Sequence, residues 1–169
     1  MGSDVALLDL AVRVGRKLLA AGCRLATAES CTGGWIAKAM TDVPGSSQWF
    51  ECGYVTYSNA AKVRDLGVSP RTLELHGAVS DATVREMAQG AMRVSGAEIA
   101  VAVSGIAGPD GAMPGKPVGT VWFAVGRRRA GGIEVEVECR QRLFEGDREA
   151  VRRGSVEYAL QLLLQLKLP

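Results

Sequence analysis

The run Ile99-Ala100-Val101-Ala102-Val103 decides the fold class of this chain. It is apolar throughout and forms the middle of a predicted strand over residues 98–104. A strand with no alternating polar positions is typical of the centre of a sheet, where both faces are buried. Such a strand needs a covering layer on each side, and helices are predicted at both ends of the chain.

A strand of another kind is predicted near the C-terminal end, in Ile133-Glu134-Val135-Glu136-Val137-Glu138. Apolar and acidic residues alternate strictly there, which predicts a half-exposed strand over residues 133–143. Gly131 and Gly132 stand just before it and predict a hairpin with the preceding strand, at residues 119–126. Two further strands are predicted over residues 24–28 and 49–57.

Three long helices are predicted from their apolar faces and their end signals. The first covers residues 4–21 and stops at Gly22, the second is capped by Ser80 and stops at Gly96, and the third is capped near Asp147. No internal repeat separates these elements. The sequence therefore predicts an α/β fold: a single layered domain over residues 1–169, with a mixed β-sheet flanked by helices on both faces.

Charge and hydropathy exclude several classes of function. The 169 residues include 20 Lys and Arg against 18 Asp and Glu, a balance too even for direct binding to nucleic acid. The longest run without a charged residue, 99–109, is shorter than the ~20 apolar residues that span a bilayer, so no membrane partner is expected. No signal peptide is apparent at the N-terminus, and this predicts a cytoplasmic protein.

The cysteines do not predict a metal site. Cys23, Cys31, Cys52 and Cys139 contain no CxxC pair, and His76 is the only histidine. A zinc site typically needs four such ligands at characteristic spacings, so we expect no metal. Scattered cysteines of this kind are typical of reduced thiols in the cytosol.

The first segment that could carry chemistry is AESCTGG, residues 28–34, between a predicted strand and a helix that starts near Thr32. Free N–H groups at a helix start attract anions, and Gly33 and Gly34 would let a ligand approach the backbone. Ser30 would project there as a nucleophile beside an oxyanion hole, with Cys31 as the second choice. A capping threonine in a glycine-rich turn explains the same residues, and the segment alone favours that interpretation.

The second segment joins Tyr57, at the end of a predicted strand, to Lys62, about one helical turn beyond Ser58-Asn59. A lysine acts as a general base only when it is neutral, which requires desolvation or nearby cations. Serine–lysine pairs occur in hydrolases that lack a catalytic histidine, and His76 is interpreted as structural. Spacing alone favours a surface lysine on a short helix.

Two further segments leave functional and structural interpretations open. Residues 103–111 follow the central strand with a Gly- and Pro-rich loop, which suits either a pocket wall or an ordered surface loop. At the start of the last helix, Arg148, Arg152 and Arg153 crowd the positive end of the helix dipole. Arg148 or Arg152 could hold a phosphate there, or neighbouring acidic side chains could balance the charge.

Taken together, these segments resemble the CinA C-terminal domain family of nicotinamide-nucleotide amidases. The resemblance covers most of the chain in the order of the family's motifs. The motifs are AESCTGG at 28–34, the YSNxxK pattern at 57–62, HGAVS at 76–80, SGIAGPDG at 104–111, KPVGTV at 116–121 and GDREAVR at 146–152.

The resemblance implies hydrolysis of the carboxamide of nicotinamide mononucleotide, which gives nicotinic acid mononucleotide and ammonia without a cofactor. It implies that Ser30 is the nucleophile, Lys62 its base and Tyr57 a partner in the proton network. The substrate-binding residues that it implies are Thr32, Gly33, Gly34, Ser104, Gly105, Gly108 and Arg148. It also favours a homo-oligomer, with a dimer first. Two alternatives are an inactive nucleotide-binding module and an interaction domain related to competence or DNA damage.

Overall fold

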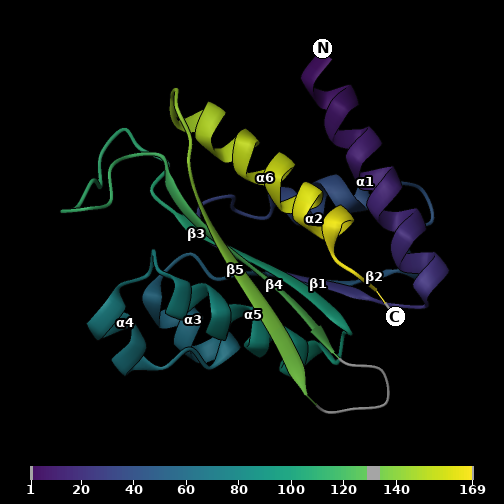
Figure 1. The fold of residues 1–169 in the computed structure, drawn as a ribbon, viewed down its shortest axis with the longest axis horizontal. Helices are drawn as coiled ribbons and strands as arrows, with labels where there is room; N and C mark the ends of the chain where they lie inside the picture. The colour runs from purple at the N-terminus through teal and green to yellow at the C-terminus, as the bar shows by residue number, and fades with distance from the viewer. Residues whose placement is uncertain (1, 129–133, 169) are drawn as a thin grey trace.

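The structure is a computed structural model that describes residues 2–128 and 134–168, and its centre is a five-stranded mixed sheet (Figure 1). Its strands lie in the order β2-β1-β3-β4-β5. Strand β1 runs parallel to β2 and β3, whereas β4 is antiparallel to β3 and β5. The strands are β1 (Leu25–Glu29), β2 (Phe50–Val55), β3 (Ile99–Gly105), β4 (Thr120–Arg128) and β5 (Val135–Leu143).

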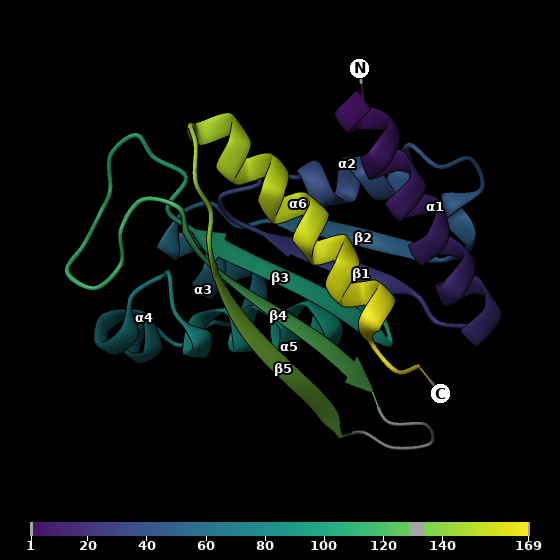
Figure 2. The same cartoon turned by 45° about the horizontal axis from the view of Figure 1, so that its top comes forward.

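Helices cover both faces of this sheet, as the sequence predicts (Figures 1 and 2). One face carries α1 (Gly2–Ala21), α2 (Trp35–Thr41) and α6 (Arg148–Gln165), and the other carries α3 (Asn59–Leu66), α4 (Pro70–His76) and α5 (Asp81–Ser95). A short 3-10 helix, η1 (Ser46–Gln48), precedes β2. The α/β class with a mixed, doubly covered sheet is therefore confirmed.

The central strand β3 shows why two covering layers are needed. Its residues 99–103 are all buried. Val101 and Val103 belong to the core beneath α1, α2 and α6, and Ala100 and Ala102 belong to the core beneath α5. Successive side chains of a strand point to opposite faces, so one apolar run supplies both cores.

The predicted capping residues of two long helices, α5 and α6, are confirmed by hydrogen bonds to the backbone. Ser80 Oγ accepts the N–H of Thr83 at the start of α5, and the carboxylate of Asp147 accepts the N–H of Ala150 at the start of α6. The start of the helix expected near Thr32 is corrected, because α2 begins at Trp35. Helix α4 was not predicted. The hairpin turn expected at Gly131 and Gly132 lies outside the described residues.

The ends of several elements meet at one edge of the sheet. Figure 2 shows the start of α6 close to the end of β3 and to the loop that leads on to β4. The carboxyl ends of the parallel strands β1 and β3 lie at this edge, which is where open α/β sheets bind ligands. Among the described residues, no helix is long and apolar enough to cross a membrane.

Candidate active site

Ser30 directly follows β1 at this edge of the sheet. Its N–H donates to the carbonyl of Val103 in β3 at 3.0 Å, so its backbone is fixed by the neighbouring central strand. The side chain is 8% exposed. Its hydroxyl lies 3.4 Å from the carbonyl of Tyr57 and within hydrogen-bond range of one amine. The residue is therefore rigidly held and still reachable from solvent.

That amine belongs to Lys62, which lies in α3 and is completely buried. Its Nζ lies 3.0 Å from Ser30 Oγ, 2.8 Å from the carbonyl of Thr56 and 3.2 Å from that of Tyr57. Burial lowers the pKa of this amine to about 8. The interpretation of Lys62 as a surface lysine is wrong, because the short helix turns this residue under the end of β2.

Tyr57 reaches the pair through its main chain and not through its ring. The carbonyl of Tyr57 accepts from Lys62, whereas its hydroxyl accepts from Arg148 Nη2 at 3.0 Å. The side chain is 58% exposed. Tyr57 therefore contacts the amine through its peptide group, while its phenol faces the solvent side of the site.

Glu29 is a buried residue of the site that the sequence reasoning missed. Its carboxylate accepts four hydrogen bonds: from Thr32 Oγ1 at 2.7 Å and from the N–H groups of Gly34, Ile36 and Ala37 at 2.8 to 3.0 Å. A helix start attracts an anion, and here the anion is a side chain of the same protein. A signal was available, since a carboxylate ends a short, mostly apolar strand just before a glycine-rich turn.

In this arrangement, polar groups of three neighbours already have partners within the chain. Thr32 is fully buried and its hydroxyl is used by Glu29, and the N–H of Gly34 is used by the same carboxylate. The N–H of Gly33 donates to the carbonyl of Ser30 at 3.0 Å. Gly33 and Gly34 have positive φ angles of 64° and 94°, so these glycines shape the turn. In the part of the chain that the structure describes, the N–H groups of Cys31 and Thr32 have no backbone or side-chain oxygen as acceptor.

The second candidate nucleophile, Cys31, is poorly suited to the task. Its side chain is buried, and burial raises the pKa of the thiol to about 12. The thiol therefore stays protonated at neutral pH, and a thiol is a far weaker nucleophile than a thiolate. This favours Ser30 over Cys31.

Arg148 and Arg152, two arginines of α6, contact different parts of the site. Arg152 donates to the carbonyls of Cys31 and Thr32, both at 3.0 Å, and so braces the turn after Ser30. Arg148 donates to the carbonyl of Gly108 at 2.8 Å and to the hydroxyl of Tyr57, and it remains exposed. Arg148 is thus the better placed of the two for an incoming anion.

The remaining candidates lie at the end of β3 and in the loop that follows. Ser104 is buried at the same edge of the sheet as Ser30. Gly105 closes β3, where an added Cβ would lie 2.6 Å from Val121, so packing against β4 requires this glycine. Gly108 offers its carbonyl to Arg148. His76, the last residue of α4, is exposed and lines a groove with Leu75, Ser80 and Lys116 among others; Ser30 does not line that groove.

A serine held against a buried lysine amine, at the carboxyl ends of an open α/β sheet, is an arrangement typical of hydrolases that work without a histidine base. The family model of the CinA C-terminal domain matches residues 7–167. The chain belongs to the CinA C-terminal domain family.

Similar proteins agree with this family over nearly the whole chain. Nicotinamide-nucleotide amidohydrolase PncC of Escherichia coli K12 is 54% identical over 163 residues, which cover 96% of each protein. The protein of the same name from Pseudomonas putida is 58% identical over 160 residues, or 95% of this chain and 96% of that one. The crystal structure of the competence damage-inducible protein A from Klebsiella pneumoniae has a TM-score of 0.88 at 43% identity, and the match covers 94% of this chain and 95% of that one.

Proposed function

We propose that this chain is an amidohydrolase that converts nicotinamide mononucleotide to nicotinic acid mononucleotide and ammonia. The Escherichia coli and Pseudomonas putida relatives are named nicotinamide-nucleotide amidohydrolases, which supports the substrate class. The observation that carries the chemistry is the 3.0 Å contact between Lys62 Nζ and Ser30 Oγ inside the protein. A serine attacks a carboxamide once a neighbouring base takes its proton.

The surroundings of Lys62 favour the neutral amine that a base requires. With a pKa of about 8, about a tenth of the amine is neutral at pH 7. A neutral amine keeps two N–H donors, and the carbonyls of Thr56 and Tyr57 accept both. The third direction, which carries the lone pair, then points to Ser30 Oγ. The two carbonyls therefore orient the base toward the nucleophile.

The proposed reaction proceeds in two halves. Ser30 Oγ bonds to the carboxamide carbon while its proton passes to Lys62 Nζ, and the C–N bond then breaks as Lys62 returns the proton to the leaving nitrogen. Ammonia departs and leaves an ester on Ser30. Water attacks the ester and gives its proton to Lys62, which restores the serine and releases nicotinic acid mononucleotide.

The negative charge on the carboxamide oxygen needs donors, and two backbone groups are candidates. The N–H groups of Cys31 and Thr32 directly follow the nucleophile and lack an oxygen acceptor among the described residues. Arg152 holds the carbonyls of the same two residues, which stiffens the turn that carries these donors. Preorganised donors of this kind stabilise a tetrahedral intermediate.

Arg148 is the proposed ligand of the substrate phosphate. A guanidinium has five N–H donors, and Arg148 uses one each on Gly108 and Tyr57. The remaining donors are free to bind an anion bidentately. Ser104, Gly105 and Gly108, at the end of β3 and in its loop, would form the adjoining wall for the nucleotide.

Two other functions, nucleotide binding without catalysis and an interaction role, would give different results in an assay of ammonia release. An inactive nucleotide-binding module would bind the substrate without releasing ammonia. A competence- or damage-related interaction domain is suggested by the name of the Klebsiella pneumoniae protein. The buried serine–lysine pair favours catalysis over both. We assign the activity to residues 1–169 as one domain that works in the cytoplasm on a small molecule, without a cofactor and without binding nucleic acid.

The direct test is ammonia release from nicotinamide mononucleotide by the purified full chain. Ser30→Ala should lose at least about a thousandfold in kcat, because no other group can form the ester. Calorimetry should show that this variant still binds the nucleotide. Ser47→Ala, at an exposed serine far from the site, is the matched control and should be unchanged. Binding without ammonia release by the parent protein would favour the inactive module.

A second test separates the two arginines. Arg148→Ala should raise KM about tenfold or more with kcat within about threefold, because it removes phosphate binding that is equal in the ground and transition states. Arg152→Ala should lower kcat instead, because the turn with the oxyanion donors loses its brace. Prior incubation with a chelator should leave the parent's activity intact. The reverse pattern for the two arginines would move the phosphate site to Arg152.

A further inference from the structure

Among the residues that the structure describes, strand β5 forms one edge of the sheet and pairs only with β4. The N–H of Phe144, directly after β5, donates to the carbonyl of Gly119, directly before β4, at 2.9 Å. In an antiparallel ladder, residues alternate between hydrogen-bonded and non-hydrogen-bonded pairs. The even-numbered residues of β5 therefore bond to β4, and the odd-numbered ones direct their N–H and carbonyl groups to the free edge.

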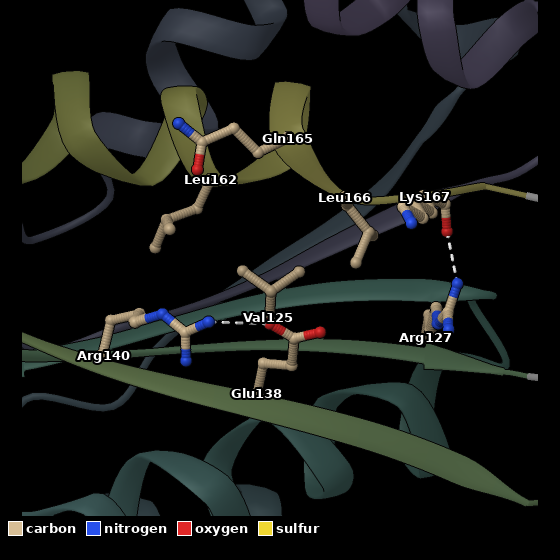
Figure 3. A pocket seen from close by; sticks show the side chains of 8 residues that line it. All are labelled: Val125, Arg127, Glu138, Arg140, Leu162, Gln165, Leu166 and Lys167. Carbon is tan, nitrogen blue, oxygen red and sulfur yellow. Dashed lines mark hydrogen bonds and ion pairs between the residues drawn. The ribbon is translucent and has the colours of Figure 1, made fainter.

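The charges of β5 are arranged symmetrically about Cys139. Glu136 and Glu138 precede it, and Arg140 and Arg142 follow it. All four are even-numbered and so share the face of β5 that lies toward α6. Figure 3 shows Glu138 and Arg140 on this face, where they line an open hollow of about 360 Å³ beside the last turns of α6. The odd-numbered Val135, Val137 and Cys139 pack on the opposite face, in the core beneath α5.

We propose that β5 pairs antiparallel with β5 of a second copy of this chain, about a two-fold axis at Cys139. The two five-stranded sheets then become one continuous sheet. In this register each Glu138 faces Arg140 of the other copy, and each Glu136 faces Arg142 of the other copy. Opposite charges directly across a strand pair are favourable, and like charges are unfavourable.

Neighbouring registers keep some opposite-charge pairs, since Glu136 faces Arg140 when the axis lies at 138, but each of them has a like-charge pair at its centre. The free-edge groups belong to odd-numbered residues, so symmetric pairings differ by shifting the axis one residue along the strand. With the axis at residue 138, Glu138 faces Glu138 of the other copy. With the axis at residue 140, Arg140 faces Arg140 of the other copy. Both put like charges directly opposite each other, so the charge pattern selects the axis at Cys139.

In the single chain, two arginines occupy carbonyl groups of this edge. Arg85 donates to the carbonyl of Val137 at 2.8 Å, and Arg140 donates to the carbonyl of Cys139 at 2.9 Å and to Glu138 at 3.1 Å. A carbonyl oxygen accepts two hydrogen bonds, so strand pairing is compatible with Arg85 staying in position. Arg140 exchanges Glu138 of its own chain for Glu138 of the other copy. Charged side chains on an edge strand can also prevent pairing with another chain. This protection is the competing explanation for the charges on β5.

The test is sedimentation of the full chain over a concentration series, with charge reversals at the central pair. The parent should show a concentration-dependent monomer–dimer equilibrium. Glu138→Arg and Arg140→Glu should each raise the dimer Kd about tenfold or more, because each change puts like charges opposite each other at two symmetric positions. The double variant Glu138→Arg/Arg140→Glu restores every opposite-charge pair, and its Kd should return to within about threefold of the parent's.

Two controls separate edge pairing from general charge or folding effects. Arg13→Glu changes an exposed arginine that is paired with Asp9 on α1, and it should leave the Kd unchanged. Gln141→Pro removes an N–H that faces the free edge and not β4, so it should give a folded monomer by circular dichroism. The proposal is overturned by a parent that stays monomeric throughout, by a Kd that ignores both reversals, or by a double variant as weak as the single ones.

Discussion

Lys62 and Lys17 are both surrounded by main-chain carbonyl groups, and they differ in their third partner. Lys17 in α1 donates to the carbonyls of Leu163, Leu164 and Leu166 at the end of α6. Lys62 donates to two carbonyls and meets the hydroxyl of Ser30 as its third neighbour. Three carbonyls match the three donors of an ammonium ion, whereas a hydroxyl can itself give up a proton.

The difference fits a structural role for Lys17 and the proposed chemical role for Lys62. The last carbonyls of a helix have no partner within the helix, and a cation there also interacts favourably with the helix dipole. Half-buried Lys17 therefore ties α6 to α1 as a charged group. Lys62 is fully buried, and its pKa is lowered to about 8. Each lysine donates to at least two carbonyl groups, so these contacts do not distinguish them. The two lysines differ in solvent access and in the third partner.

The largest expected effect is the loss of turnover in Lys62→Met and Lys62→Arg. Methionine has no basic group, and arginine keeps the charge but has no accessible neutral form, so kcat should fall by about a thousandfold or more in both. Nucleotide affinity should stay within about threefold, because the proposed phosphate ligand is Arg148 and not Lys62. The measurement is kcat and KM of both variants. Near-normal turnover in Lys62→Arg would remove the lysine from the mechanism.

The lowered pKa of Lys62 should make both activity and stability rise with pH. In the proposed mechanism the neutral amine is the active form, so kcat should rise with pH through about 8. The pKa in the folded state lies below the ordinary lysine value of 10.5, so the unfolded chain binds more protons between these two values. The free energy of unfolding should therefore increase by about 3 kcal/mol as the pH rises from 8 to 10.5. Denaturant titrations of Lys62→Met should lack this increase.

Glu29→Gln comes next in expected size. The amide keeps one oxygen acceptor but turns an NH₂ group toward the N–H donors at the start of α2, so buried donors lose their partner. We expect a loss of about 2–4 kcal/mol in the free energy of unfolding. Because Ser30 adjoins this residue, kcat should fall about tenfold or more while KM changes little. Asp42→Asn at the exposed end of α2 is the matched control. An unaffected kcat in folded Glu29→Gln would show that the carboxylate only supports the fold.

Lys17→Met should produce the opposite pattern from Lys62→Met. It leaves the carbonyls at the end of α6 without their donor and should cost about 1–3 kcal/mol in the free energy of unfolding. The kcat should remain within about twofold, since the site lies at the other end of α6. Thermal unfolding and turnover are measured on the same preparation. A variant with full stability would show that Lys17 does not fasten these two helices.

The smallest effect is expected for His76→Ala. The side chain is exposed and does not contribute to the serine–lysine pair. Both kcat and the free energy of unfolding should stay close to the parent's, within about twofold and about 0.5 kcal/mol. A folded but inactive His76→Ala protein would contradict the assignment of the base to Lys62.

The predictable parts of the fold depended on short-range signals. The apolar run of β3, the Ser80 and Asp147 caps and the alternation before Cys139 each act within a few residues, and the strands and caps that they predict are present in the structure. The start of α2 was missed because Gly33 and Gly34 take left-handed conformations, which delay the helix to Trp35. Local spacing does not reveal that conformation.

The site was less predictable, because its contacts are long-range. Residues 30 and 62 are far apart in the chain, and only the folded sheet shows that Lys62 is buried beside Ser30. Spacing alone favours a surface lysine. The family resemblance named both residues, but it did not separate the ring of Tyr57 from its carbonyl. It also did not point to Glu29, whose four partners all depend on the turn that it stabilises.

That carboxylate has a consequence for how the site becomes ordered. The turn after β1 obtains its anion when the chain folds, so the loss of conformational entropy in this loop occurs on folding and not on substrate binding. Substrate binding energy need not be used to order the nucleophile, and the free enzyme should already have its bound geometry. Amide hydrogen exchange at Gly34, Ile36 and Ala37 should therefore be as slow in the free protein as in the nucleotide complex.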